Sequence, residues 1–270
     1  MNVRKILYLF VFILLLSLFA ACSNQDSSAE ADTGGDDNLL EEVKDKGVLH
    51  IGTEGTFAPF SFHDDSGKLT GYDVEIVEEV AERLGVEPEF HETQWDSIFA
   101  GLDAKRFDVI ANQVGITEER LEKYEFTEPY TRSTAVLIIH EDTEGITSFE
   151  DMEGKVASGT LTSNWGELAE SHGAELEKVE GFNQAIDLVI SKRVDGTFHD
   201  KLTILDFLNQ RPDAPIEIIP EETEAVSENA FMFRQGNEEI IEKFNSILED
   251  MREDGTLAEI SEKWFGEDVS

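Results

Sequence analysis

The feature that most restricts the fold of this chain is an alternation of short apolar runs with amphipathic segments, which fills most of residues 39–270. The run 48–53 has the length of a strand, and the segment 71–85 places apolar residues on one helical face before it stops at Gly85. The alternation continues with strands at 88–93, 107–114, 155–160, 175–180, 194–200 and 216–220, and with helices at 95–106, from 163, and at 182–193, 201–210, 237–254 and 256–266. This order predicts an α/β fold in which mostly parallel sheets are flanked by helices.

Two extended segments interrupt the alternation. The segment 131–141 is a long apolar run without a turn residue, and 229–236 is a shorter counterpart near the end of the chain. If the chain forms two α/β units, these segments would carry it from one unit to the other and back. Two further core strands would have the same periodicity, so the sequence leaves both interpretations open.

Two ten-residue segments resemble each other. AKRFDVIANQ (104–113) and SKRVDGTFHD (191–200) share Lys-Arg-x-Asp, and each reads as a helix end that leads into a strand finishing in polar residues. Chance similarity is one explanation. The other is that two similar α/β units each deliver polar groups at the carboxyl end of a strand, which is the edge where open parallel sheets bind ligands.

The N-terminus has the pattern of an export signal. Arg4 and Lys5 precede an apolar run of 16 residues that stops at Cys22, and a bilayer span needs about 20 residues. The residues before Cys22 resemble the cleavage site of a bacterial lipoprotein, although Phe19 stands where that pattern usually has Leu. We therefore expect residues 1–21 to be a signal peptide and Cys22 to carry a thioether-linked lipid anchor with palmitate; an incidental thiol is the alternative.

Residues 22–38 contain no large apolar group and predict a flexible tether. The expected location is therefore the extracellular face of the cell membrane, as in a Gram-positive bacterium. With 59 acidic and 21 basic residues, the chain has a formal net charge of −38, which argues against nucleic acid or an anionic lipid surface as a partner. Because Cys22 is the only cysteine, the fold cannot depend on an internal disulfide.

Motifs of the common enzyme classes are absent from the sequence, including the phosphate-binding loop, the nucleophile elbow and the metalloprotease helix. We therefore expect no catalytic residues and no cofactor. We also expect no metal site, because the histidines are scattered without the close spacing of metal ligands. They are His50, His63, His91, His140, His172 and His199.

A cation occupies an unusual place in the stretch ANQVGITEER (111–120). Thr117 is a good N-cap, and the third helical position after it favours Glu or Gln because the helix dipole is positive there, yet the chain has Arg120. A planar guanidinium is well suited to a carboxylate, and free backbone N–H groups around Gly115 would assist it. This combination predicts a site for a ligand with a carboxylate group.

Other candidate residues stand where strands give way to loops. Asp200 and Glu54 follow or end strands and are candidates to bind an ammonium group, although Asp200 could instead cap the next helix. Phe57 and Trp95 could enclose the apolar part of a ligand or belong to the core. A second candidate anion site is the loop that contains Gly159, Thr160, Leu161 and Thr162.

Several stretches together resemble the polar amino-acid substrate-binding proteins of ABC importers, known as solute-binding protein family 3. They are 51–85, 95–120, 124–133 and 251–266, and the resemblance extends over 39–268. The version ANQVGIT at 111–117 is most similar to L-cystine-binding members. The resemblance implies a two-lobed periplasmic-binding-protein fold of type II, with residues 39–136 and 230–270 in one lobe and 137–229 in the other.

The resemblance also implies roles for single residues. The carboxylate-binding arginine of the family falls on Arg120, assisted by the backbone at Gly115 and by Thr160. The ammonium-binding acid falls on Asp200, assisted by the backbone of Gln113. Ligand-lining positions fall on Asn112, Phe57, Trp95 and Glu54. Many relatives have Ser or Thr where this chain has Gly115, so one side-chain contact to the ligand is lost here.

The function implied by this resemblance is transport, not catalysis. A monomeric lipid-anchored protein would close its lobes on an amino acid, L-cystine in the most similar members, and the closed state would be recognised by the permease subunits of an ABC importer. The alternatives are another polar amino acid as ligand, a dehydratase-type enzyme on the same fold that acts on prephenate-like acids, and an extracytoplasmic sensor module.

Overall fold

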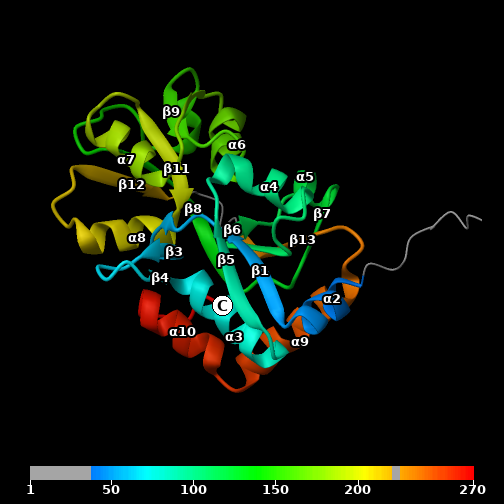
Figure 1. The fold of residues 1–270 in the computed structure, drawn as a ribbon. Coiled ribbons are helices and arrows are strands. Elements are labelled where there is room, and N and C mark those ends of the chain that lie inside the picture. Colours follow the sequence, from blue (N-terminus) through cyan, green and yellow to red (C-terminus); the bar gives the residue numbers. More distant parts are fainter. Residues whose placement is uncertain (1–37, 221–225) are drawn as a thin grey trace, which may run out of the picture. The chain divides into compact units, whose positions relative to one another are not determined.

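The computed structural model describes residues 38–220 and 226–270 (Figure 1). The predicted signal peptide, Cys22 and the predicted tether up to residue 37 therefore lie outside the described residues. Among the described residues, no helix is long and apolar enough to cross a membrane.

Most strands of the described chain belong to one sheet. They are β1 (Val48–Thr53), β5 (Glu87–Glu92), β6 (Val109–Gly115), β7 (Tyr124–Phe126), β8 (Thr131–His140), β9 (Val156–Gly159), β10 (Glu175–Lys178), β11 (Gly196–Asp200), β12 (Ile216–Pro220) and β13 (Val226–Arg234). Their order is β10-β9-β11-β8-β13-β6-β1-β5, with β12 paired to β8 and β7 paired to β13. A small second sheet contains β2 (Thr56–Phe57), β3 (Ser61–His63) and β4 (Leu69–Thr70).

The helices are α2 (Leu39–Lys46), α3 (Tyr72–Leu84), α4 (Trp95–Asp103), α5 (Glu118–Leu121), α6 (Asn164–Ser171), α7 (Phe182–Ile190), α8 (Lys201–Gln210), α9 (Glu238–Glu253) and α10 (Thr256–Phe265), together with the 3-10 turn η1 (Phe149–Met152). Gly85 ends α3 in the left-handed conformation, as the sequence predicts.

Two parallel units with the same strand order form the two ends of the main sheet. In one unit β5 and β6 flank β1, and in the other β10 and β11 flank β9. We call the unit of β1, β5 and β6, with α2 to α5, α9, α10 and the small sheet, the first lobe. The unit of β9 to β11, with α6 to α8 and β12, is the second lobe (Figure 1). The predicted two-lobed α/β fold is confirmed.

The Lys-Arg-x-Asp echo has the same structure in both lobes. Lys105 and Lys192 both adopt left-handed backbone angles, with φ of 55° and 57°, and this ends α4 and α7 earlier than the sequence predicts. Asp108 then accepts a hydrogen bond from the backbone N–H of His50 at 3.0 Å. Asp195 accepts the equivalent bond from Val156 at 2.8 Å. Each aspartate therefore ties its strand to the central strand of its lobe.

The two long extended segments are β8 and β13, and they pair with each other and with both lobes. Residues 131–134 of β8 pair with β13, whereas residues 135–139 pair with β11. β13 also pairs with β6 of the first lobe. All of these pairs are antiparallel, in contrast to the parallel pairs within the lobes. The chain thus passes from the first lobe to the second and back through two adjacent strands.

Burial on both faces explains why β8 has no alternating pattern. Leu137 and Ile139 pack in one core cluster with Phe149 of η1, while Val136 and Ile138 pack in another with α7 and α8. A strand that is covered on both sides reads as a continuous apolar run. The largest cluster lies in the first lobe, where α3, α9 and α10 cover one face of β1 and β6.

Candidate functional site

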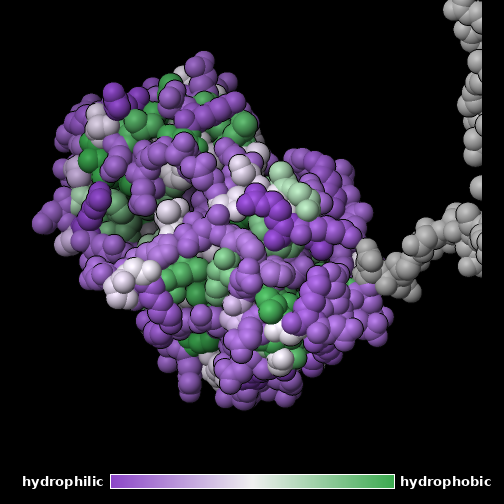
Figure 2. Space-filling model, viewed as in Figure 1, coloured by the Kyte–Doolittle hydropathy of each residue, from purple (hydrophilic) through white to green (hydrophobic). Residues whose placement is uncertain are grey.

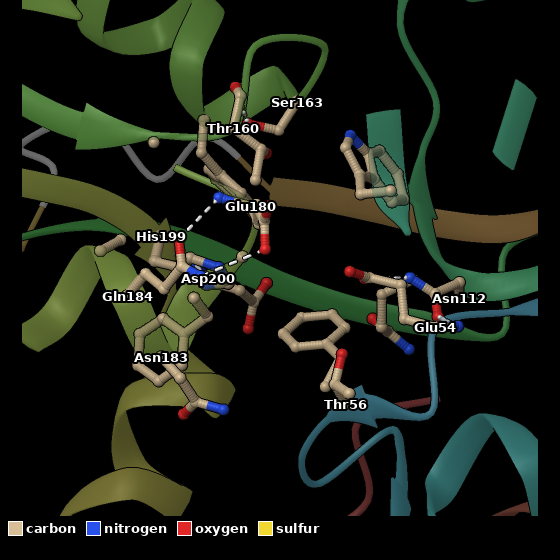
Figure 3. A pocket seen from close by; sticks show the side chains of 18 of the residues that line it. Glu54, Thr56, Asn112, Thr160, Ser163, Glu180, Asn183, Gln184, His199 and Asp200 are labelled. Carbon is tan, nitrogen blue, oxygen red and sulfur yellow. Dashed lines mark hydrogen bonds between the residues drawn. The ribbon is translucent and has the colours of Figure 1, made fainter. Parts of the chain in front are cut away.

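A cavity of about 300 Å³ lies where the carboxyl ends of β1, β6 and β11 meet. Figure 3 shows Glu54 and Asn112 of the first lobe on one side of it and His199 and Asp200 of the second lobe on the other. The sequence-predicted residues that line it are Glu54, Phe57, Trp95, Asn112, Gln113, Thr160 and Asp200. Those that do not line it are Gly115, Arg120, Leu161 and Thr162.

Glu54 is held at the cavity wall by Asn112. The side-chain amide of Asn112 donates to Glu54 Oε2 at 2.7 Å, and its oxygen accepts from the backbone N–H of Glu54 at 2.8 Å and from the hydroxyl of Thr53 at 3.0 Å. Burial raises the pKa of Glu54 to about 7. Asn112 is fully buried, so its main effect is to orient the Glu54 carboxyl group.

Gln113 has a strained backbone that a buried acid holds in place. Its φ is 49°, in the left-handed region that residues other than glycine rarely adopt. The carboxyl group of Asp73 accepts hydrogen bonds from the backbone N–H and from the side-chain amide of Gln113, both at 2.6 Å. Asp73 is fully buried, and this burial raises its pKa to about 7.

Asp200 combines two roles that the sequence left as alternatives. Its Oδ1 atom accepts from the backbone N–H of Leu202 and from the hydroxyl of Ser133, both at 2.8 Å, so it caps α8. Its Oδ2 atom is buried and has no hydrogen-bond partner among the described residues. Burial raises the pKa of Asp200 to about 6. One oxygen of a cavity-lining carboxyl group therefore stays available.

An aromatic cluster surrounds His199 and includes rings from both lobes. The imidazole stacks on Trp165, with centroids 5.7 Å apart, and meets the edges of Phe182 at 4.8 Å and of Phe57 at 5.7 Å. Burial lowers the pKa of His199 to about 3, so the ring is neutral at physiological pH. Its Nδ1 atom accepts from the backbone N–H of Asp200 at 2.9 Å, which leaves the ring proton on Nε2.

Arg120 lies beside the cavity, in a buried position behind Trp95. Thr117 caps α5 by accepting the backbone N–H of Arg120, as the sequence predicts. The guanidinium donates to the carbonyl of Gly115 at 2.7 Å and to that of Thr162 in the second lobe at 3.0 Å, and it lies 5.4 Å from the ring centroid of Trp95. Burial lowers the pKa of Arg120. Among the described residues, no carboxylate forms an ion pair with it.

Trp95 adds an unpaired donor to this corner of the cavity. Its indole Nε1 atom is buried and has no hydrogen-bond partner in the part of the chain that the structure describes. Buried polar groups normally have partners. An unpaired donor in a cavity wall therefore suggests a site for an acceptor group of a ligand.

Further contacts join the lobes next to the cavity. The backbone N–H and the hydroxyl of Thr162 donate to Asp96 of α4, at 3.3 Å and 2.9 Å. A Cβ atom on Gly115 would lie 3.3 Å from the side-chain nitrogen of Asn164 in the second lobe. Glycine at this position therefore gives α6 room to approach β6. Leu161 is 49% exposed.

Four important residues of this site escaped the sequence analysis as site candidates. They are Asp73, Trp165, Phe182 and His199. An acid in the first turn of a helix is ordinary, because it favours the helix dipole, so Asp73 gave no signal. The aromatic residues in the first turns of α6 and α7 carry no pattern that separates a cavity residue from a core residue. For His199 the sequence did carry a signal, because this residue belongs to the polar end of a strand, where ligand-binding groups are expected.

Two lobes of repeated topology, with a cavity that takes polar side chains from both, define a two-lobed ligand-binding protein. Residues 49–267 match the sequence model of the bacterial extracellular solute-binding proteins, family 3, and the chain belongs to this family. Proteins of this family bind small ligands such as amino acids outside the cell.

Three known proteins illustrate the similarity. The chain is 46% identical over 268 residues to the L-cystine-binding protein TcyA of Bacillus subtilis (strain 168), covering 99% of both sequences. It is 45% identical to the L-cystine solute receptor of Neisseria gonorrhoeae in the unliganded open conformation, over 86% of this chain and 98% of that one, with a TM-score of 0.59. A substrate-binding protein of an ABC uptake transporter from Streptococcus pneumoniae with bound histidine is 25% identical, over 87% and 98%, with a TM-score of 0.80.

Proposed function

We propose that this chain is the extracellular binding protein of an amino-acid ABC importer and that its ligand is L-cystine. The observation that carries the proposal is the pair of acidic side chains on opposite walls of the cavity, Glu54 and Asp200. Cystine has two ammonium groups, and one acid from each lobe would bind one of them. The names of TcyA and of the Neisseria receptor, which are both for L-cystine, support the same ligand.

Both acids are prepared for a cationic partner. Asn112 orients Glu54, and Asp200 keeps its Oδ2 atom without a partner among the described residues. Burial raises the pKa of each group because the carboxylate form lacks solvation. An ammonium group that enters the cavity restores this lost stabilisation, so it binds to the carboxylate form.

The carboxylate groups of the ligand would be bound beside Trp95. Arg120 is buried and uses two of its donor groups on carbonyl oxygens, and a guanidinium has five N–H donors. The unpaired indole N–H of Trp95 is a further donor. Thr160, which lines the cavity before α6, would contribute from the second lobe.

The aromatic cluster supports a ligand with sulfur in its middle. Phe57, Trp165 and Phe182 surround His199 within the cavity wall. Sulfur atoms make favourable contacts with aromatic rings, worth about 0.3–1.5 kcal/mol each. The disulfide and methylene groups of cystine would lie against these rings.

Binding would act through closure of the lobes. The contacts of Thr162 with Arg120 and Asp96 join the lobes directly. The TM-score is higher with the histidine-bound relative, 0.80 at 25% identity, than with the open cystine receptor, 0.59 at 45% identity. This difference supports a closed arrangement here. We also propose lobe boundaries at 136/137 and 229/230; the change of partner in β8 comes after residue 134, two residues before the first of them.

The remaining expectations concern the whole protein. A signal peptide over 1–21, a lipid anchor with palmitate at Cys22, a tether, a monomeric state and a Gram-positive host are proposals from the sequence. Tethering would keep the protein near the permease subunits that receive the ligand. A labelling experiment with a fatty-acid analogue, in wild type and Cys22→Ser, tests the anchor.

One observation favours an enzyme as the second candidate. A carboxyl group with a pKa near 7 in a cavity, such as Glu54, is suited to general acid–base catalysis. The dehydratase alternative therefore has a direct test, which is turnover of a prephenate-like acid. Product formation that Glu54→Gln abolishes would support it, and the proposed transport function would then fail.

Calorimetric titration with a set of ligands tests the proposed function. We expect L-cystine to bind at least about thirtyfold more tightly than S-methyl-L-cysteine, because the smaller molecule has one ammonium group and a charged pair is worth about 2–5 kcal/mol. Equal affinities would exclude the two-acid arrangement. Absence of binding by cystine, histidine, glutamine and arginine would exclude the amino-acid function altogether.

A further inference from the structure

A cluster outside the cavity brings two histidines and a glutamate together on the edge of the first lobe. His50 lies on β1, and its direct neighbour in the register of β5 is Glu89. His91 follows two residues later on β5, so its side chain is on the same face of the strand as that of Glu89. Neither the cavity nor its lining includes any of the three.

The three ligand atoms form a small triangle. His50 Nδ1 lies 3.0 Å from His91 Nε2 and 3.6 Å from a carboxylate oxygen of Glu89, and that oxygen lies 3.5 Å from His91 Nε2. In a tetrahedral zinc site with bonds of about 2.0–2.1 Å, neighbouring ligand atoms are about 3.3 Å apart. The observed triangle therefore has the dimensions of one face of such a tetrahedron.

We propose that His50, Glu89 and His91 bind a Zn²⁺ ion. Imidazole nitrogen and carboxylate oxygen are ligands that Zn²⁺ accepts, and three protein ligands leave a fourth position for water or another small ligand. The side chains are 31%, 57% and 29% exposed in the order His50, Glu89, His91, so an ion can reach them from solvent.

The surroundings hold the two histidines in place. Asp108 accepts the backbone N–H of His50, which fixes β1 against β6 at this point. The ring of Phe107 lies 6.3 Å from that of His91. His50 is three residues before the end of β1, about 10 Å along a strand, so the metal site is separate from the ligand cavity.

The second lobe provides an internal comparison. Val156 has the place of His50, because its N–H makes the equivalent bond to Asp195. Glu175 and Glu177 of β10 have the places of Glu89 and His91, since they pair with Val156 and Ser158. The histidines are thus a feature of the first lobe alone, and the βαβ scaffold does not require them.

Zn²⁺ titration by calorimetry, with excess Mg²⁺ to occupy the acidic surface, tests the proposal. We expect one Zn²⁺ per chain, with the affinity lowered at least about tenfold in His50→Gln, His91→Gln and Glu89→Gln, because even indirect metal contacts have effects of this size. The matched control is His63→Gln, which removes a half-exposed histidine whose Nε2 atom lies 3.2 Å from a carboxylate oxygen of Glu92 and which belongs to no three-ligand cluster among the described residues. This control should bind Zn²⁺ as the wild type does.

A second readout separates a metal site from a hydrogen bond between the two rings. Co²⁺ at a tetrahedral site gives intense visible absorption, and this band should appear in the wild type and be lost in His91→Gln. If a histidine variant does not fold, Glu89→Gln still tests the proposal, because Glu89 is exposed and its substitution should leave the fold intact. Absence of Zn²⁺ binding, or an equal loss in His63→Gln, would overturn the proposal.

Discussion

Strands β6 and β11 have the same position in the two lobes and the same Lys-Arg-x-Asp entrance, but they end in different ways. Asp108 and Asp195 tie their strands to β1 and β9 by equivalent hydrogen bonds. Further along, β6 presents Asn112, whose polar groups orient Glu54 directly after β1. β11 instead presents the carboxyl group of Asp200 itself, which also caps α8.

Within one short segment, the start of each strand serves the fold and its end serves ligand binding. The entrance is repeated because both lobes need the same connection between a helix and a central strand. The exits differ because they face the cavity from opposite sides. Figure 2 shows that hydrophilic residues cover most of the visible face of the molecule, in keeping with the formal net charge of −38. The many surface charges are a general property of the chain, whereas the carboxyl groups at the strand ends line the cavity at defined positions.

The largest expected effect comes from removing the cation of the first lobe. Arg120→Ala should weaken cystine binding by about 4 kcal/mol, because it removes a buried donor and leaves the ligand carboxylate unpaired. Calorimetry measures the change. Lys123→Ala is the control, since Lys123 is an exposed cation just after α5 that pairs with Glu119. Affinity within about twofold of wild type in Arg120→Ala would place the carboxylate elsewhere.

The second prediction concerns the buried acid that supports β6. The pKa of Asp73 is raised from 3.8 to about 7 by burial, so the folded state binds an extra proton between these pH values. Its stabilising contribution is therefore complete below pH ~4 and is lost as pH rises to ~7, an effect of about 4 kcal/mol. Urea unfolding at several pH values should reveal this slope in the wild type.

Asp73→Asn should remove this part of the pH dependence, because the amide does not titrate. Asp65→Asn, at an exposed aspartate in the turn between β3 and β4, should leave the slope unchanged and controls for the charge of the whole chain. Equal slopes in wild type and Asp73→Asn would show that Asp73 is not the group responsible.

The third prediction concerns ligand affinity, which should rise with pH, whereas the contribution of Asp73 to stability falls with pH. Glu54 and Asp200 have pKa values raised to about 7 and about 6 in the absence of ligand, and an ammonium group needs their carboxylate forms. Cystine affinity should be complete above pH ~7 and should fall by about a hundredfold towards pH ~5.5, at about 1.4 kcal/mol per pH unit. In Glu54→Gln the decrease should begin about one pH unit lower. A flat profile would contradict the assignment.

The smallest expected effect tests the approach of the lobes. Gly115→Ala places a Cβ atom 3.3 Å from Asn164, which should weaken ligand binding by about 1 kcal/mol through crowding of the closed state. Gly181 also lines the cavity, but a Cβ atom there would have no neighbour within 4 Å. Gly181→Ala is therefore the control, and equal effects of the two substitutions would exclude crowding at Gly115.

Local sequence patterns predicted much of the fold. The bounds of α8 and β12 agree with the apolar runs 201–210 and 216–220, and Thr117 caps α5 as expected. The early ends of α4 and α7 were not predictable, because the left-handed angles of Lys105 and Lys192 depend on the turn into the next strand. Lysine itself carries no signal for such an angle.

The site was less predictable, since its key contacts join distant segments. Asp73 and Gln113 meet through the packing of α3 on β6, and His50 and His91 meet only through the register of β1 and β5. Neither pair has a spacing that sequence analysis recognises. The strand ends themselves were predictable, because parallel strands present their carboxyl ends at one edge. Most predicted cavity residues lie there, although their binding roles stay predictions.

The most direct test of the account is calorimetric titration of L-cystine against Asp200→Asn, with urea unfolding of the same variant. Asparagine caps helices as well as aspartate does, and a neutral side chain avoids the burial cost that raises the pKa of Asp200, so the free energy of unfolding should fall no more than about 0.5 kcal/mol below that of the wild type at pH ~7.5. Cystine affinity should fall by about a hundredfold, because an amide cannot balance an ammonium group. Wild-type affinity in a stable Asp200→Asn protein would contradict the claim that one ligand is bound by acids from both lobes.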